Sequence, residues 1–87
     1  MEVLLDKISF MNLRQELKET IAEILGINPD SFQNDTEAAD IENWDSVNNV
    51  IILSTLEEKY DVMFPDDDLF DLVSVDAIAE EIEKLKA

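Results

Sequence analysis

Residues 42–47 read Glu-Asn-Trp-Asp-Ser-Val, and at Ser46 an irregular polar segment gives way to a helical pattern that continues to about residue 60. Asp and Ser both cap helices well, because a side-chain oxygen accepts a hydrogen bond from a free backbone N–H of the first turn. A structural cap is therefore the default interpretation of Asp45-Ser46 taken alone. The position also suits a second role, since an anionic group on the Ser46 hydroxyl would lie at the positive end of the helix dipole.

The helix expected over residues 46–60 is apolar on two opposite sides. At about 100° per residue, the first apolar face comprises Ile52, Leu53, Leu56 and Tyr60. The opposite face comprises Val47, Val50, Ile51 and the small Ser54. The first face is expected to pack as core. Either the second face meets residues 1–11 or a partner protein, or both faces are buried in a central helix, and the pattern does not decide between these alternatives.

The whole chain predicts an all-α fold, a small bundle of three main helices plus one short helix. The first helix is expected to begin after Asn12, a suitable N-cap, and to end at Gly26, because glycine readily takes the left-handed backbone that ends helices. Its apolar residues recur at helical spacing: Leu13, Leu17, Ile21, Ile24 and Leu25. Residues 1–11 either extend this helix or pack as a separate strap. Residues 27–44 form a polar loop with isolated apolar anchors at Ile27, Phe32 and Ile41.

Two further helices are expected after Pro65. Acidic residues 66–68 suit the start of a short helix over about 66–71, and Leu69, Phe70 and Leu72 would close over the core. Ser74 is expected to cap a last helix over about 75–86, with an apolar stripe of Val75, Ile78, Ala79, Ile82 and Leu85. The acidic run lacks the spaced oxygens, glycine and final glutamate of a calcium loop, so no metal site is expected there.

Composition narrows the function classes. The 87 residues fit one domain, and 22 Asp and Glu against 6 Lys and Arg give a formal net charge of −16. Such a charge repels nucleic acid and favours partners with basic surfaces. The chain has neither Cys nor His, so it has no thiol or imidazole of its own for catalysis. With no signal peptide pattern and no apolar run of membrane-spanning length, we expect a cytoplasmic monomer.

From about Leu13 to Leu85 the sequence resembles the acyl carrier protein family. Four segments in order carry the resemblance: the Asp45-Ser46 pair that opens a helix, Leu56-Glu57-Glu58-Lys59-Tyr60 at the end of that helix, Val62-Met63-Phe64-Pro65-Asp66-Asp67, and Ser74-Val75-Asp76 at the start of the last helix.

The resemblance implies a carrier that is not an enzyme. Ser46 would bear 4′-phosphopantetheine, transferred from coenzyme A by a phosphopantetheinyl transferase, and Asp45 would cap the helix and help that transferase recognise the site. The thiol of the arm would hold acyl or aminoacyl groups as thioesters. Val47, Val50 and Ile51 would form an apolar docking patch for acyl-activating and acyl-transferring enzymes with basic surfaces. Ile52, Leu53, Leu56, Phe70 and Ile78 would line the interior, where a short acyl chain could shelter.

Two departures from the family pattern indicate a specialised lipid, polyketide or related pathway instead of housekeeping fatty acid biosynthesis. The family commonly has leucine where this chain has Val47, and acidic residues where this chain has Asn48, Asn49, Val50 and Ile51. Trp44 resembles what is seen in free-standing carriers of specialised pathways, and it equally fits a loop anchor that packs on the bundle. The alternative function is an acidic helical interaction module that binds a basic protein and carries no prosthetic group.

Overall fold

The computed structural model describes the backbone of residues 2–86 and the side chains of residues 12–86. All regular secondary structure in this range is helical. The main helices are α1 (Glu2–Leu25), α2 (Ser46–Tyr60) and α3 (Val75–Lys86). Three single 3-10 turns lie in the connections: η1 (Pro29–Ser31), η2 (Ala38–Asp40) and η3 (Asp66–Asp68). The all-α fold with three main helices is confirmed, whereas the short helix expected over 66–71 is a single 3-10 turn.

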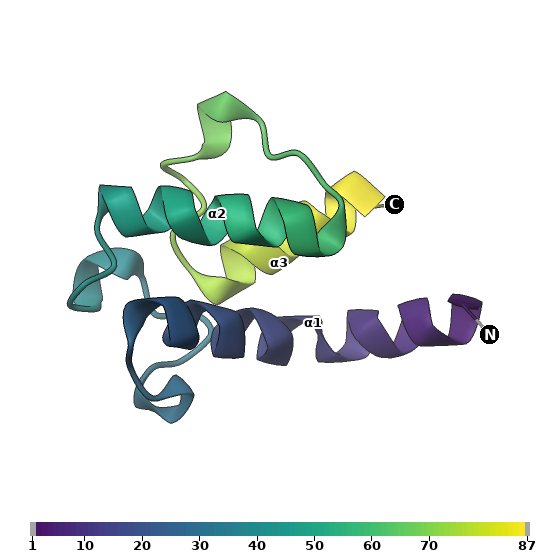
Figure 1. The fold of residues 1–87 in the computed structure, drawn as a ribbon, viewed down its shortest axis with the longest axis horizontal. Coiled ribbons are helices and arrows are strands. Elements are labelled where there is room, and N and C mark those ends of the chain that lie inside the picture. Colours follow the sequence, from purple (N-terminus) through teal and green to yellow (C-terminus); the bar gives the residue numbers. More distant parts are fainter. Residues whose placement is uncertain (1, 87) are drawn as a thin grey trace.

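The three helices pack as a small bundle in which α1 contacts both α2 and α3. Figure 1 shows α1 and α2 running alongside each other, with α3 between them in this view and crossing behind α2. The connection from α1 to α2 wraps around one end of the bundle, and the connection from α2 to α3, which contains η3, arches over the side of α2 away from α1. The N-terminal end of α2 therefore lies between two irregular segments.

Helix α1 is longer than the apolar spacing after residue 12 predicted. The expected N-cap at Asn12 is wrong, because Asn12 lies inside the helix and the backbone of residues 2–11 extends it. Residues 2–25 contain neither glycine nor proline, so no residue interrupts the hydrogen-bond ladder. The predicted end is confirmed: Gly26 has φ 71°, and its N–H and that of Ile27 donate to the carbonyls of Glu23 and Ala22. This pattern satisfies the last carbonyls of the helix.

The core contains most of the residues predicted for it. Its buried side chains include Leu13, Leu17, Ile21, Phe32, Ile52, Leu53, Leu56, Phe64, Leu72, Val75, Ile78 and Ile82. Two predicted core residues are wrong. Phe70 is 76% exposed, because the backbone after η3 is irregular and turns Leu72 inward but Phe70 outward. Leu85 is exposed in the last turn of α3, beyond the buried stripe.

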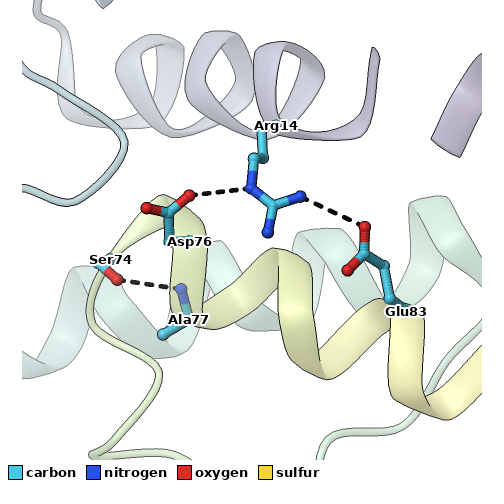
Figure 2. Close-up of polar contacts among 5 residues, drawn as sticks. All are labelled: Arg14, Ser74, Asp76, Ala77 and Glu83. Atoms are coloured by element: carbon cyan, nitrogen blue, oxygen red, sulfur yellow. Dashed lines mark hydrogen bonds and ion pairs between the residues drawn. The ribbon is translucent and has the colours of Figure 1, made fainter. Parts of the chain in front are cut away.

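Polar contacts link α3 to α1 at two points along α3. The guanidinium of Arg14 on α1 lies between Asp76 and Glu83 on α3, with nitrogen–oxygen distances of 2.9 and 3.3 Å (Figure 2). The hydrogen bond to Asp76 is the main reason that the pKa of Arg14 is raised. Ser74 caps α3 as predicted, since its hydroxyl accepts the N–H of Ala77 over 3.1 Å.

Candidate functional site

The N-terminus of α2 is capped by Asp45 and not by Ser46. The Asp45 carboxylate accepts the backbone N–H of Asn48 over 2.9 Å, and its carbonyl accepts the N–H of Asn49 over 2.8 Å. Ser46 follows as the first helical residue and is exposed. The structural role of the pair therefore belongs to Asp45, and the Ser46 hydroxyl takes no part in the cap.

Trp44 anchors the loop that delivers Ser46. Its ring is buried, and its indole N–H donates to the side-chain oxygen of Asn49 over 2.8 Å. The Asn49 amide in turn donates to the backbone carbonyl of Leu69 over 2.9 Å. We call this chain of hydrogen bonds the Trp44–Asn49–Leu69 bridge. It joins the loop before α2, the first turn of α2 and the segment after η3, and it confirms the interpretation of Trp44 as a loop anchor.

Asn49 belongs to the stretch 48–51 that in fatty-acid carriers resembling this chain is commonly acidic and faces partner enzymes, but here its side chain faces inward. Its side chain is 6% exposed and lies within the bridge, so it cannot contribute to a docking surface in this conformation. Neighbouring Asn48 remains near the surface and donates to the carbonyl of Asn43, whose φ of 77° lies in the left-handed region. The two adjacent amides therefore both hold the backbone around Ser46.

The long connection between α1 and α2 is fixed to the start of α3. The N–H of Ala38 donates to the carbonyl of Val73 over 2.7 Å, and the N–H of Asp76 donates to the carbonyl of Asn34 over 3.0 Å. The packed segments leave a hollow of about 240 Å³ beside Ser46, which we call the Ser46 hollow. Its lining residues are Ala38, Trp44, Asp45, Ser46, Asn49, Phe70 and Val73.

The second apolar side of α2 is exposed. Val47, Val50 and Ile51, which we call the α2 apolar patch, are 69%, 50% and 45% exposed. The opposite face is buried through Ile52, Leu53 and Leu56. Of the alternatives that the pattern left open, burial of both faces is therefore wrong. Phe70 and Met63 are further exposed large apolar side chains. No local sequence signal predicts the exposure of Phe70, because only the irregular backbone after η3 turns it outward.

The described residues contain neither a metal site nor a membrane-spanning helix. In this part of the chain no group of three or more acidic side chains is placed to hold a metal ion. Across the same residues, no helix combines the length and the apolar character that crossing a bilayer requires.

Comparison with known proteins assigns the chain to a family. Residues 15–82 match the family described as "Phosphopantetheine attachment site", a range that contains α2 with both of its flanking connections. The chain belongs to the acyl carrier protein family. It is similar to an acyl carrier protein of Bdellovibrio bacteriovorus, with 31% identity over 74 residues that cover 85% of this chain and 95% of the relative. An acyl carrier protein of Rhodococcus erythropolis is 38% identical over 72 residues, 83% of this chain and 79% of the relative.

Membership of this family defines the kind of work that the chain does. The chain is a non-catalytic carrier, and its prosthetic group is 4′-phosphopantetheine. This confirms the cofactor and the carrier class that the resemblance implied. The geometry of the site indicates which residue bears the group and which surface the partner enzymes contact.

Proposed function

We propose that Ser46 bears the 4′-phosphopantetheine group and that the chain carries acyl or aminoacyl groups as thioesters on it. The observation that supports this assignment most strongly is the division of roles at the start of α2. Asp45 provides the helix cap, which leaves the exposed Ser46 hydroxyl available for modification. The matched family range, residues 15–82, includes this position.

The residues around Ser46 fit the group. A phosphodiester on the Ser46 oxygen lies in the first turn of α2, where the helix dipole favours negative charge even in a chain with a formal net charge of −16. The acidic Asp45 cap makes the site recognisable to a transferase. The chain contains no cysteine, and the prosthetic group, when bound, supplies the thiol. The bridge through Trp44 keeps the attachment turn in one conformation, ready for the transferase.

Attachment is a phosphoryl-group transfer catalysed by the transferase. The Ser46 oxygen forms a bond to the phosphorus of coenzyme A that bears the pantetheine chain, and the pyrophosphate P–O bond breaks. Adenosine 3′,5′-bisphosphate leaves with the electron pair of that bond. The serine proton passes to a base on the transferase. Ser46 needs no activating base of its own chain for this reaction, in keeping with the absence of histidine.

The α2 apolar patch is proposed to dock acyl-activating and acyl-transferring enzymes. It begins directly after Ser46, so an enzyme that reaches the arm meets it. The surrounding acidic charge steers basic partners, and the apolar contact then determines which of them stays bound. An apolar patch at this position supports a specialised lipid, polyketide or related pathway, with the carrier acting as a monomer in the cytoplasm.

Loading of the apo protein tests the proposal. The protein is incubated with coenzyme A and a promiscuous phosphopantetheinyl transferase, and its intact mass is measured. A gain of one phosphopantetheine supports the carrier. An unchanged mass under conditions that load a known carrier protein would contradict it and would favour the alternative, an acidic interaction module without a prosthetic group.

A further inference from the structure

The Ser46 hollow combines apolar walls with a polar base. Ala38, Trp44, Phe70 and Val73 supply the apolar lining. Asn49 supplies an amide, and Asp45 and Ser46 lie at the site of attachment. These residues come from the loop before α2, the first turn of α2 and the connection to α3, and they are held together by the Trp44–Asn49–Leu69 bridge and by the hydrogen bond from Ala38 to Val73.

The exposure of Phe70, an apolar side chain at the hollow, is not explained by a contribution to the stability of the fold. It is 76% exposed, as much as Met63, which does not line the hollow. An exposed phenylalanine contributes little to the core. Because Phe70 lies at the Ser46 hollow, next to the proposed attachment residue, its exposure points to a ligand that covers it.

We propose that the Ser46 hollow is the resting site of the phosphopantetheine arm, an inference that rests on the proposed attachment at Ser46. After its phosphate the arm has a methylene group, then a carbon that bears two methyl groups, then a carbon that bears a hydroxyl, and then an amide. Phe70, Trp44 and Val73 match the methyl groups, while Asn49 matches the amide. Asn49 uses one N–H and one acceptor position of its side chain in the bridge, and an amide has further capacity for both.

The size of the hollow limits what it holds. Its volume of about 240 Å³ lies below the roughly 300–1,000 Å³ of pockets that enclose drug-sized ligands. Ile52 and Leu56 on the inner face of α2 do not line the hollow and are fully buried in the core. The hollow therefore takes a section of the arm, and the cargo at the thiol end stays outside, where a partner enzyme on the α2 apolar patch can reach it.

Nuclear magnetic resonance of the loaded protein tests this inference. The two methyl groups of the arm should show nuclear Overhauser effects to the rings of Phe70 and Trp44, and the indole N–H resonance of Trp44, the only tryptophan, should shift on loading. Phe70→Ala should remove the contact to residue 70 and reduce the Trp44 shift. Met63→Ala, at an equally exposed site, is the matched control and should leave both unchanged.

The outcomes separate this inference from the proposed function. Intact mass reports loading in every sample. If the wild-type protein gains the arm but shows no contact between its methyl groups and the two rings, the resting site is wrong and the carrier proposal stands. If the Phe70→Ala protein gains the arm fully and its Trp44 resonance shifts as much as in wild type, Phe70 does not contact the arm. The resting site proposed here is then wrong. If no mass is gained, both proposals fail.

Discussion

The indole N–H of Trp44 donates a hydrogen bond of 2.8 Å to the side chain of Asn49, and both groups are buried. Asn49→Leu retains similar volume but leaves the indole N–H and the carbonyl of Leu69 without their partner. An unsatisfied buried group such as the indole N–H costs about 1–3 kcal/mol, and loss of the part-buried bond to Leu69 adds to that cost. We expect denaturant unfolding, followed by circular dichroism, to show a loss in that range or somewhat above it.

Asn48→Ala is the matched control for this change. Asn48 is the neighbouring amide and lies nearer to the surface, where water can replace its hydrogen bond to the carbonyl of Asn43. We expect it to cost clearly less than Asn49→Leu. Equal losses for the two variants would show that the bridge does not stabilise the attachment turn.

Much of the fold was predictable because local signals and apolar periodicity agree. The glycine at the end of α1, the start of α2 at Ser46 and the Ser74 cap of α3 were predicted from single residues, and the structure contains all three. The start of α1 was wrong because an asparagine that could cap a helix can also be accommodated inside one. Local sequence does not reveal which occurs.

The candidate site was only partly predictable. The helix start at Asp45-Ser46 and the second apolar side of α2 follow from residue type and helical spacing, whereas the roles expected for these residues come from the family resemblance. The burial of Asn49 and the exposure of Phe70 do not, because both depend on where the irregular segment after η3 passes across α2. Hydrogen bonds between residues far apart in the chain, such as the one from Ala38 to Val73, place that segment. Contacts between residues so far apart in the chain leave no local sequence pattern from which they can be predicted.

Charge on the α2 apolar patch should impair docking without unfolding the protein. Val50 and Ile51 are half-exposed, so Val50→Asp with Ile51→Asp should change the free energy of unfolding by about 0.5 kcal/mol per site or less. The rate at which a cognate acyl-activating enzyme loads the arm should fall at least about fivefold, equivalent to roughly 1 kcal/mol at the interface. Met63→Asp, an exposed site outside the patch, is the control. A collapsed thermal transition in the double variant would show instead that the patch is packed.

Salt should stabilise this protein. The formal net charge of −16 makes self-repulsion a large cost of the compact state, and the Debye length falls to about 10 Å at 0.1 M ionic strength. We expect the thermal midpoint to rise with ionic strength, and to rise more with magnesium than with sodium at matched ionic strength. Asp67→Asn with Asp68→Asn should weaken the magnesium response. Midpoints that stay flat in both titrations would contradict this account.

Tyr60 should titrate above its ordinary value. Burial raises the pKa of its hydroxyl, and its hydrogen bond of 2.8 Å to the Glu16 carboxylate raises the pKa further. The folded state therefore holds this proton more tightly than the unfolded state does. Its contribution to stability is fully present below the ordinary pKa of about 10 and is lost as pH rises beyond it.

The phenolate absorbance of the only tyrosine measures this titration. The midpoint in the folded protein should lie above the ordinary value, and Glu16→Gln should move it downward because a carboxylate acceptor is removed. Tyr60→Phe serves as the blank. A midpoint at or below the value of free tyrosine would mean that Tyr60 is not held against Glu16 in solution.

The identity of the modified residue tests the central claim most directly. Wild-type, Ser46→Ala and Ser54→Ala proteins are each incubated with coenzyme A and a promiscuous phosphopantetheinyl transferase, and their intact masses are compared. Ser54 is the matched control, since it is another exposed serine on α2. Folding of Ser46→Ala should be retained because Asp45 provides the cap. The account predicts one added phosphopantetheine on wild type and on Ser54→Ala, and none on Ser46→Ala. A full phosphopantetheine gain on folded Ser46→Ala would contradict it.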